Sequence, residues 1–366
     1  MKISDQIKMQ QLAQLEWLIQ TDVGCRGIHR IPEDNLCTRT QGHLAKAIQF
    51  LIEHPGNEVG IVTGFFIPNV QPPAPENDGP PGALFLARGL NRLGYPVLLI
   101  SDRYGLPLLA QGVHLYANQL DHCELIEFPS QWSRSDHVAA QDIRYANNNM
   151  MMEEVRNFFL NHDRLSCLIA IERVGPSHTL ESFSKQENLS DESNFNRFLS
   201  QGPGESQGEP FTMNGLPVGQ DTAPIHLLFE NKTIASKPIF TIGIGDGGNE
   251  IGMGSIPWRV IACNIASAHA GKFACRVAAD ATIVAGVSNW AAYALIAGLY
   301  LCLNRADEFL ELFDEAAETK LIESYFQTGI AVDGKLGHPA MSVDGIPWEL
   351  HKKLFGLIKA IVVYYQ

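Results

Sequence analysis

Short apolar runs of strand length alternate with helical patterns along the first half of the chain, and this alternation limits the possible folds most strongly. Residues 95–101 and 166–171 are mainly apolar, as in parallel strands that are buried on both faces. Residues 82–93 and 106–117 carry apolar side chains at helical spacing. The alternation is typical of an α/β fold with a doubly wound, mostly parallel sheet and helices on both faces, a Rossmann-like three-layer arrangement. The predicted strands are 58–67, 95–101, 123–128, 166–171, 239–244 and 281–287, and the predicted helices are 4–20, 40–54, 82–93, 106–117, 136–162, 223–235, 291–303, 307–326 and 348–364.

Length and composition fit one large domain. The chain has 366 residues, of which 45% are hydrophobic, so it can bury an extensive core. We predict a single α/β domain over residues 1–366, although two smaller domains would also suit this length. Residues 174–222 break the alternation, because they are rich in Ser, Gly, Asn, Gln and Pro. We predict an irregular insertion or a lid there.

Charge and cysteine usage restrict the partners and the compartment. The formal net charge is −13 and there is no basic run, so nucleic acid and anionic membrane surfaces are not expected partners. Seven cysteines are scattered without a C-x-x-C pair, which favours reduced thiols in a cytosol-like compartment. The sequence has no apolar stretch of transmembrane length and no signal-peptide core, so we expect a cytoplasmic protein. The expected partner is a small-molecule substrate, and a homo-oligomer stays open.

The most distinctive motif is a glycine-rich run, Ile-Phe-Thr-Ile-Gly-Ile-Gly-Asp-Gly-Gly-Asn-Glu-Ile-Gly-Met-Gly, at residues 239–254. Its first part is a β-type stretch that leads into a loop. Open α/β sheets place their sites in such loops, at the carboxyl ends of strands. Glycines there allow tight turns and a close approach of a ligand to the backbone, and Gly245, Gly247 and Gly248 are the candidate contacts.

The same loop matches a nucleotide fingerprint, but its charges favour a cation. Gly243, Gly245 and Gly248 satisfy G-x-G-x-x-G after a strand. Asp246, however, would lie where a pyrophosphate requires backbone N–H groups and no negative charge. The acidic residue that would bind a ribose is also missing from residues 260–264. A metal ion or a substrate ammonium group is therefore the expected ligand.

Three polar residues of this loop are the catalytic candidates: Asp246, Asn249 and Glu250. A helix that starts near Gly248 would aim Asp246 and Glu250 at one point. These two carboxylates are also the tentative metal ligands, and they suit Mg²⁺ or Mn²⁺. The alternative is a tight structural turn whose acids cap a helix N-terminus.

Polar groups also follow other predicted strands. Asp78 lies in a Gly- and Pro-rich loop before a helix, as a substrate contact or only as a cap. Ser288 and Asn289 open a helix, where free N–H groups favour an anion, and ordinary capping is compatible with that role. Glu172 and Arg173 end a buried strand, and charges in such a place need partners that offset desolvation.

Two arginines are candidate anchors for a substrate carboxylate. Arg173 could hold it in a bidentate fork, and a structural pair with Glu172 is the equal alternative. Arg26, which lies near two glycines, is the second candidate. Asp102 at the end of a predicted strand could bind substrate, but we expect it to pair with Arg103.

Several of these motifs together resemble the D-glutamate cyclase C-terminal-like domain family. They are, in order, Thr-Gly-Phe at 63–65, Asp-Gly-Pro-Pro-Gly-Ala at 78–83, Ile-Glu-Arg at 171–173, the glycine-rich run at 243–254, Val-Ser-Asn-Trp at 287–290, Val-Asp-Gly at 332–334 and Ser-Val-Asp-Gly at 342–345. The resemblance extends from about residue 24 to residue 351, and 184–210 depart from it. It implies an α/β fold and the conversion of D-glutamate into 5-oxo-D-proline and water. Domains of this family form the second half of a two-domain mitochondrial enzyme and stand alone in many bacteria.

The implied reaction gives roles to the candidate residues. The α-amine must lose a proton and attack the γ-carboxyl group, so Asp246 or Glu250 would bind the ammonium and act as the general base. Arg173 or Arg26 would hold the α-carboxylate. The glycine-loop N–H groups, the helix start at 288–289 or a metal ion would stabilise the oxyanion. The alternatives are a non-catalytic or regulatory module that binds an acidic metabolite or a nucleotide, and an enzyme that acts on a different small amino acid or a phosphorylated substrate.

Overall fold

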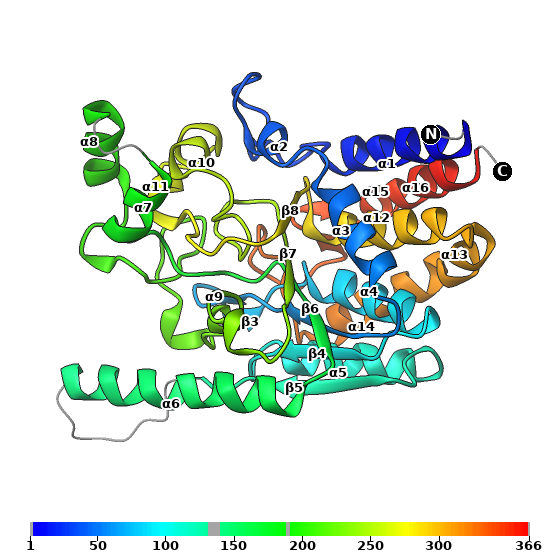
Figure 1. The fold of residues 1–366 in the computed structure, drawn as a ribbon, viewed down its shortest axis with the longest axis horizontal. Coiled ribbons are helices and arrows are strands. Elements are labelled where there is room, and N and C mark those ends of the chain that lie inside the picture. Colours follow the sequence, from blue (N-terminus) through cyan, green and yellow to red (C-terminus); the bar gives the residue numbers. More distant parts are fainter. Residues whose placement is uncertain (1–2, 131–139, 188–190, 365–366) are drawn as a thin grey trace.

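The computed structural model describes residues 3–130, 140–187 and 191–364. At the centre of this described part is a six-stranded sheet (Figure 1). The strands lie in the order β5-β4-β1-β6-β7-β8, and every neighbouring pair is parallel. Each strand overlaps a strand that the sequence predicted, so the predicted α/β fold is confirmed. The strands are β1 (Glu58–Thr63), β4 (Val97–Ser101), β5 (Cys123–Glu127), β6 (Leu165–Ile171), β7 (Phe240–Gly245) and β8 (Ala281–Val284).

Two hydrophobic cores cover the two faces of the sheet, because side chains alternate between the faces along each strand. Ile61 and Ile169 belong to the first core, and their neighbours Val62 and Leu168 belong to the second. The helices of the first core are α1 (Ile3–Ile19), α3 (His43–Glu53), α4 (Pro80–Arg92), α5 (Leu106–Leu115), α12 (Ser288–Cys302), α13 (Ala306–Leu312), α14 (Glu315–Thr328), α15 (Trp348–His351) and α16 (Lys353–Val363). Those of the second are α2 (Leu36–Arg39), α6 (Ala140–Asn161), α7 (Leu180–Gln186), α8 (Glu192–Gln201), α9 (His226–Glu230), α10 (Trp258–Asn264) and α11 (Ala270–Phe273).

The order of the strands reverses between β1 and β6. Beyond β1 lie β4 and β5, and beyond β6 lie β7 and β8 on the other side. Ligands of open α/β sheets bind at the carboxyl ends of the strands at such a reversal. Thr63 ends β1 and pairs with Ile171 of β6, so Glu172 directly follows this pair. The topology therefore points to this edge of the sheet as the place of a site.

The segment predicted to be irregular, residues 174–222, contains two helices, α7 and α8. Phe183 of α7 and Phe198 of α8 stack at 4.2 Å between ring centroids, and both meet Trp258 edge-on. The sequence pattern missed these helices because they are short and bury few side chains. The segment is thus anchored in the second core, and its role as a lid stays a prediction.

Two predicted elements differ from the observed ones, one because it is divided and one because it is shorter. The predicted helix 307–326 is divided into α13 and α14, because Asp314 caps α14 by accepting backbone N–H bonds from Ala316 at 2.9 Å and Ala317 at 3.3 Å. The predicted strand 58–67 ends at Thr63, where Gly64 turns the chain at φ +107°. Two short hairpins complete the described fold: β2 (Phe66–Ile67) with β3 (Ala74–Pro75), and β9 (Ser342–Val343) with β10 (Ile346–Pro347).

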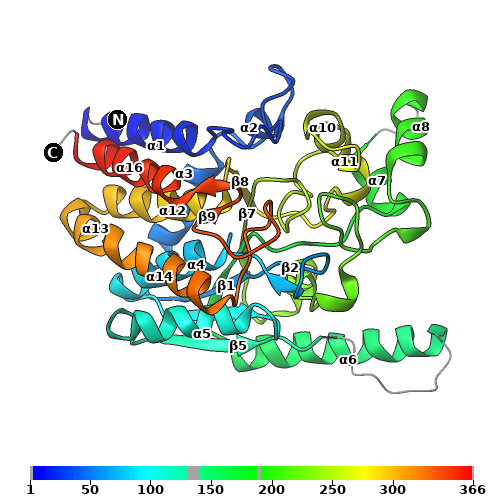
Figure 2. The ribbon, with the colours of Figure 1, turned by 180° about the vertical axis from the view of Figure 1, so that it is seen from behind.

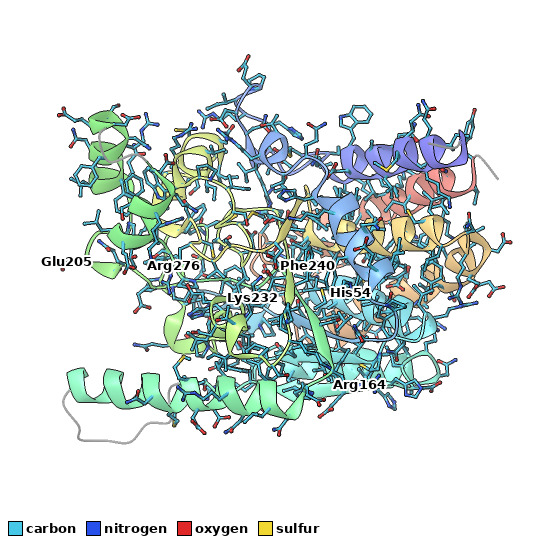
Figure 3. All side chains as sticks on the ribbon, viewed as in Figure 1. His54, Arg164, Glu205, Lys232, Phe240 and Arg276 are labelled. Atoms are coloured by element: carbon cyan, nitrogen blue, oxygen red, sulfur yellow. The ribbon has the colours of Figure 1, made fainter. Side chains whose placement is uncertain are left out.

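The first and last helices, α1 and α16, lie side by side, so the two ends of the described chain meet (Figure 2). Side chains fill the space between the layers (Figure 3). Among the described residues, no helix combines the length and the apolar character that crossing a bilayer requires.

One buried residue of the first core should make the stability of the fold depend on pH. His351 is 0% exposed, and neither ring nitrogen has a hydrogen-bond partner among the described residues. Its ring stacks on Trp348 at 5.1 Å between centroids. Burial lowers the pKa of His351 from 6.5 to about 3. Below pH 6.5 the unfolded chain therefore takes up a proton that the folded chain does not, and stability falls as the pH falls.

We expect His351→Phe to remove this contribution. As the pH falls from about 6.5 to about 4, the wild type should lose about 1.4 kcal/mol per pH unit relative to the variant, because only the wild-type unfolded state gains the proton. Urea unfolding of both proteins across this window measures the difference. A difference that stays constant with pH would contradict a neutral, buried His351.

Candidate active site

A cavity of about 770 Å³ opens at the carboxyl ends of the central strands. Glu172 lines it from the end of β6, and Asn249 from the loop after β7, where its Nδ2 donates to Phe211 O at 3.0 Å. Arg26 and Asp344 reach the same cavity from opposite ends of the chain. Three predicted site residues, Arg26, Glu172 and Asn249, therefore lie around one cavity.

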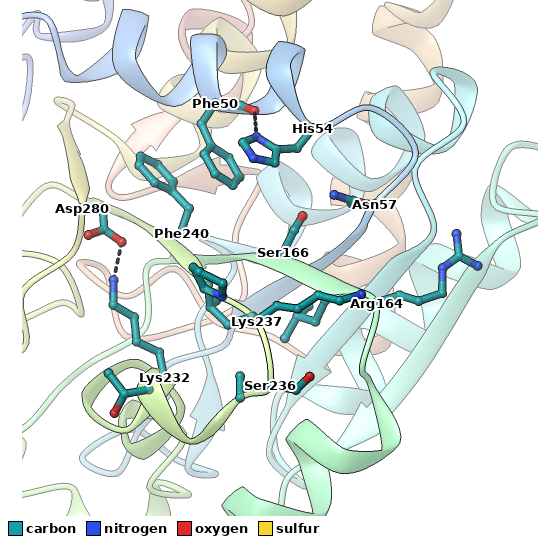
Figure 4. Close-up of a pocket in the computed structure, with 15 residues that line it drawn as sticks. Phe50, His54, Asn57, Arg164, Ser166, Lys232, Ser236, Lys237, Phe240 and Asp280 are labelled. Atoms are coloured by element: carbon teal, nitrogen blue, oxygen red, sulfur yellow. Dashed lines mark hydrogen bonds and ion pairs between the residues drawn. The ribbon is translucent and has the colours of Figure 1, made fainter.

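A cavity of about 790 Å³ lies at the opposite edge of the sheet, near the starts of β6 and β7 (Figure 4). Arg164 and Phe240 line it, and Lys232 forms an ion pair with Asp280 there. None of the predicted site residues is among its described lining. The candidate site is therefore the cavity at the carboxyl ends.

The glycine-rich loop folds back onto its own strand. A Cβ atom on Gly243 would lie 2.4 Å from Gly252 Cα and 2.5 Å from Ile251 O, and one on Gly245 would clash as well. Gly248 and Gly252 adopt φ +95° and +104°, which disfavour any side chain. Glycine is required here because two backbone segments touch.

The carboxylate of Glu250 stabilises this loop by accepting hydrogen bonds from its backbone. Its Oε1 accepts N–H bonds from Asp246 at 3.0 Å and from Gly247 at 2.7 Å, and its Oε2 accepts one from Gly248 at 2.7 Å. The next helix is α10, which begins only at Trp258, so the helix predicted near Gly248 is wrong. The N–H groups predicted to stabilise an oxyanion are thus already bonded to the Glu250 carboxylate.

Asp246 is fully buried beside Arg26. Arg26 Nη1 lies 3.2 Å from Asp246 Oδ1, and the same guanidinium forms an ion pair with Asp344, with Nε 3.2 Å from Oδ2. Neither oxygen of Asp246 accepts a hydrogen bond from the described residues. Arg26 thus holds two protein carboxylates, where a substrate carboxylate was predicted.

The guanidinium of Arg173 binds to other groups of the protein. Its Nη1 lies 2.6 Å from Asp102 Oδ2, its Nη2 donates to Ala223 O at 2.8 Å, and the residue is 1% exposed. The ion pairs predicted for Asp102 with Arg103 and for Arg173 with Glu172 are replaced by this one. These partners leave the predicted role of Arg173 as a substrate anchor without support.

Asp78 joins the starts of two helices. Its Oδ1 accepts an N–H bond from Asn289 at 3.2 Å, and its Oδ2 accepts one from Ser288 at 3.3 Å, so it caps α12. Asn289 Oδ1 in turn accepts the N–H of Gly79 at 3.1 Å. Ser288 Oγ donates to Glu172 Oε2. Glu172 itself adopts φ +44°, a strained conformation for a large side chain of the kind that clusters at functional sites.

Burial and like charges dominate the electrostatics of this edge. Asp78, Glu172 and Asp246 each offer a carboxylate oxygen, and these oxygens lie within 4.8 Å of one another. Burial first, and neighbouring carboxylates next, raise the pKa of Glu172 well above its usual value. Burial likewise raises the pKa of Asp246, against the opposing effect of Arg26. Burial and Asp344 raise the pKa of Asp78 to about 7. Acids buried in this way hold protons or bind a cation.

Sequence reasoning missed Glu76 and Asp344 as site residues. Glu76 lines the cavity, and burial followed by nearby carboxylates raises its pKa well above its usual value. Asp344 lies in the Ser-Val-Asp-Gly motif at 342–345, whose residue types are those of an ordinary turn. That turn is fixed by Asp333, whose Oδ2 accepts the N–H of Gly345 at 2.8 Å. Two Val-Asp-Gly triplets meet in this contact, and their repetition was the available signal in the sequence.

The chain that carries this fold and this buried acidic site belongs to a known family. Residues 15–190 and 200–359 match the family described as "D-glutamate cyclase-like, C-terminal", so the chain belongs to it. It is also similar to the human protein "D-glutamate cyclase, mitochondrial", with 28% identity over 366 residues, and the match covers 93% of this chain. The match covers 50% of the human protein, so the chain spans about half the length of this relative.

Proposed function

We propose that this chain is a D-glutamate cyclase-like lyase that converts D-glutamate into 5-oxo-D-proline and water. The observation that carries the proposal is the group of buried carboxylates beside Arg26 at the end of the parallel strands. Family membership and the relative's name support the same reaction. An ammonium group would offset the buried negative charge, and the cavity has room for a small acidic amino acid.

The reaction forms a bond between the α-nitrogen and the γ-carboxyl carbon, and it breaks one C–O bond of that carboxyl group. Two of the three ammonium protons leave with the oxygen as water, and the third stays on the lactam nitrogen. Holding amine and carboxyl group in contact can supply roughly 7–11 kcal/mol of the barrier.

Asp246 is the proposed general base. Its carboxylate accepts no hydrogen bond from the described residues, and its raised pKa suits a group that takes a proton from an ammonium. Glu172, whose pKa is also raised, would hold the proton that leaves with the γ-carboxyl oxygen. A substrate carboxylate could displace the Asp344 carboxylate from Arg26, since Arg26 and Asp344 both line the cavity. Arg26 would then anchor the substrate.

Incubation of the purified chain with D-glutamate, with and without Mg²⁺ or Mn²⁺, tests the proposal when 5-oxoproline is followed by chiral chromatography. We expect 5-oxo-D-proline from D-glutamate and much less product from L-glutamate. Folded protein that forms no product would refute the lyase.

That negative result would favour the second candidate, a module that binds an acidic metabolite. The observation in its favour is that the chain spans half the length of its human relative. This candidate predicts that D-glutamate raises the melting temperature without being converted.

A further inference from the structure

We propose that Asp78, Glu172 and Asp246 together bind one divalent cation of the Mg²⁺ or Mn²⁺ type. The catalytic use of such an ion rests on the proposed function, but its binding does not. The proton-transfer roles given above to Asp246 and Glu172 apply to the cation-free protein, because a bound divalent ion would hold both carboxylates deprotonated. Sequence reasoning paired Asp246 with Glu250 as the tentative ligands. In the structure Glu250 accepts three N–H bonds of its own loop, whereas Asp78, Glu172 and Asp246 bring oxygens within 4.8 Å of one another. Asp78 also accepts backbone N–H bonds, from Gly79, Ser288 and Asn289, so the choice of ligands rests on this convergence of oxygens.

The three ligands converge from different parts of the fold. Asp78 precedes α4, Glu172 follows β6, and Asp246 follows β7, and all three are buried. Their nearest oxygens lie within 4.8 Å of one another. Each ligand oxygen lies about 2.1 Å from Mg²⁺ in octahedral coordination, so two such oxygens are about 3.0 Å apart when adjacent and about 4.2 Å apart when opposite. Side-chain rotations that bring the three oxygens up to about 2 Å closer together would therefore reach the distances that one ion requires.

The local balance of charge calls for a cation. Asp78, Glu172 and Asp246 are at most 5% exposed, so water does not screen their charges. Arg26 is the cation that approaches Asp246, and it is shared with Asp344. One guanidinium cannot offset four carboxylates, and uncompensated buried charge costs several kcal/mol. A divalent ion between the three carboxylates offsets most of the remainder.

A buried hydroxyl independent of the carboxylates also points to a ligand. Thr63 ends β1, is 0% exposed, and its Oγ1 has no hydrogen-bond partner among the described residues. Its surroundings locate this oxygen, because a Cβ atom on Gly79 would lie 2.5 Å from Thr63 Oγ1 and 2.9 Å from Glu172 Cβ. The hydroxyl therefore lies between two of the ligand-bearing segments. Buried hydroxyl groups are normally bonded, and a water molecule on the cation would supply that bond.

The ligand chemistry selects the type of ion. All three groups are carboxylates, which suit Mg²⁺ and Mn²⁺, whereas structural and catalytic zinc sites use mainly histidine and cysteine. Three carboxylates leave further coordination positions for water or for substrate oxygen. Mn²⁺ is the practical probe, because its paramagnetism reports binding in the absence of turnover.

The test is a titration of the full, metal-stripped chain with Mn²⁺, followed by the electron paramagnetic resonance signal of the free ion and without substrate. We expect uptake of one Mn²⁺ per chain, and displacement by Mg²⁺. Glu172→Gln should weaken binding at least about tenfold, because loss even of an outer-shell contact has that effect. Glu311→Gln is the matched control, since the Glu311 side chain is 68% exposed and forms an ion pair with Arg92 at the surface.

Asp78→Asn provides a second variant if Glu172→Gln does not fold, and circular dichroism checks each protein. Absence of saturable uptake by the folded wild type would overturn the proposal. A wild-type affinity for Mn²⁺ in both ligand variants would overturn it as well. The outcome is separable from that of the lyase. Binding of Mn²⁺ without formation of 5-oxoproline would support the cation site and refute the lyase. Turnover by a chain that takes up no Mn²⁺ would support the lyase and refute the cation site.

Discussion

Asp246→Asn should lower the turnover of D-glutamate by about 10²- to 10⁴-fold, the usual contribution of a general base. Asparagine keeps the size of the side chain but cannot accept a proton from the substrate ammonium. The fold should be retained, because neither oxygen of Asp246 accepts a hydrogen bond within the described part of the chain and Arg26 keeps its ion pair with Asp344. Removal of a buried charge with a raised pKa should even leave the urea midpoint equal or higher.

The measurement is the rate of 5-oxoproline formation by wild type and variant at saturating D-glutamate, with the urea midpoint of each protein. Asp121→Asn makes the same chemical change at an exposed turn and should turn over at the wild-type rate. Near-normal turnover by folded Asp246→Asn would remove Asp246 from the chemistry. Equal losses in both variants would show that the assay reports protein quality instead.

The site was partly predictable because of where its residues stand on the strands. A polar residue at the end of a buried strand must lie at the edge of the sheet, and this argument found Glu172 and Asp246. It also found Asp78, since the start of α4 lies at the same edge. In a parallel sheet all carboxyl ends meet there, so the order of the strands was not needed to bring these carboxylates together.

The direction of each side chain was not predictable in the same way. Glu250 folds back to bond three N–H groups because the loop turns at Gly248, and spacing alone suggested a helix instead. Arg173 and Asp102 find each other across neighbouring segments that are 71 residues apart. Arg26 and Asp344 are 318 residues apart. Such pairs depend on tertiary packing, which cannot be inferred from the local pattern or the spacing of residues in a single sequence.

Gly243→Ala should disrupt the site, because the added methyl group displaces the backbone of the loop. The new methyl group would lie 2.4 Å from Gly252 Cα and 2.5 Å from Ile251 O, and both are backbone atoms that cannot rotate away. The loop would have to separate from β7, which breaks the enclosure formed around Glu250. We expect a loss of about 3 kcal/mol or more in the free energy of unfolding, at the upper end for an overpacked core.

Gly356→Ala is the matched control for this substitution, because a Cβ atom there meets nothing within 4 Å. Gly356 lies inside α16, so alanine should stabilise the protein by about 0.5–1 kcal/mol through its higher helix propensity. Urea unfolding of both variants then gives changes of opposite sign for the same added methyl group. A Gly243→Ala protein as stable as wild type would mean that β7 and the returning loop do not touch, and the enclosed position of Asp246 would lose its structural basis.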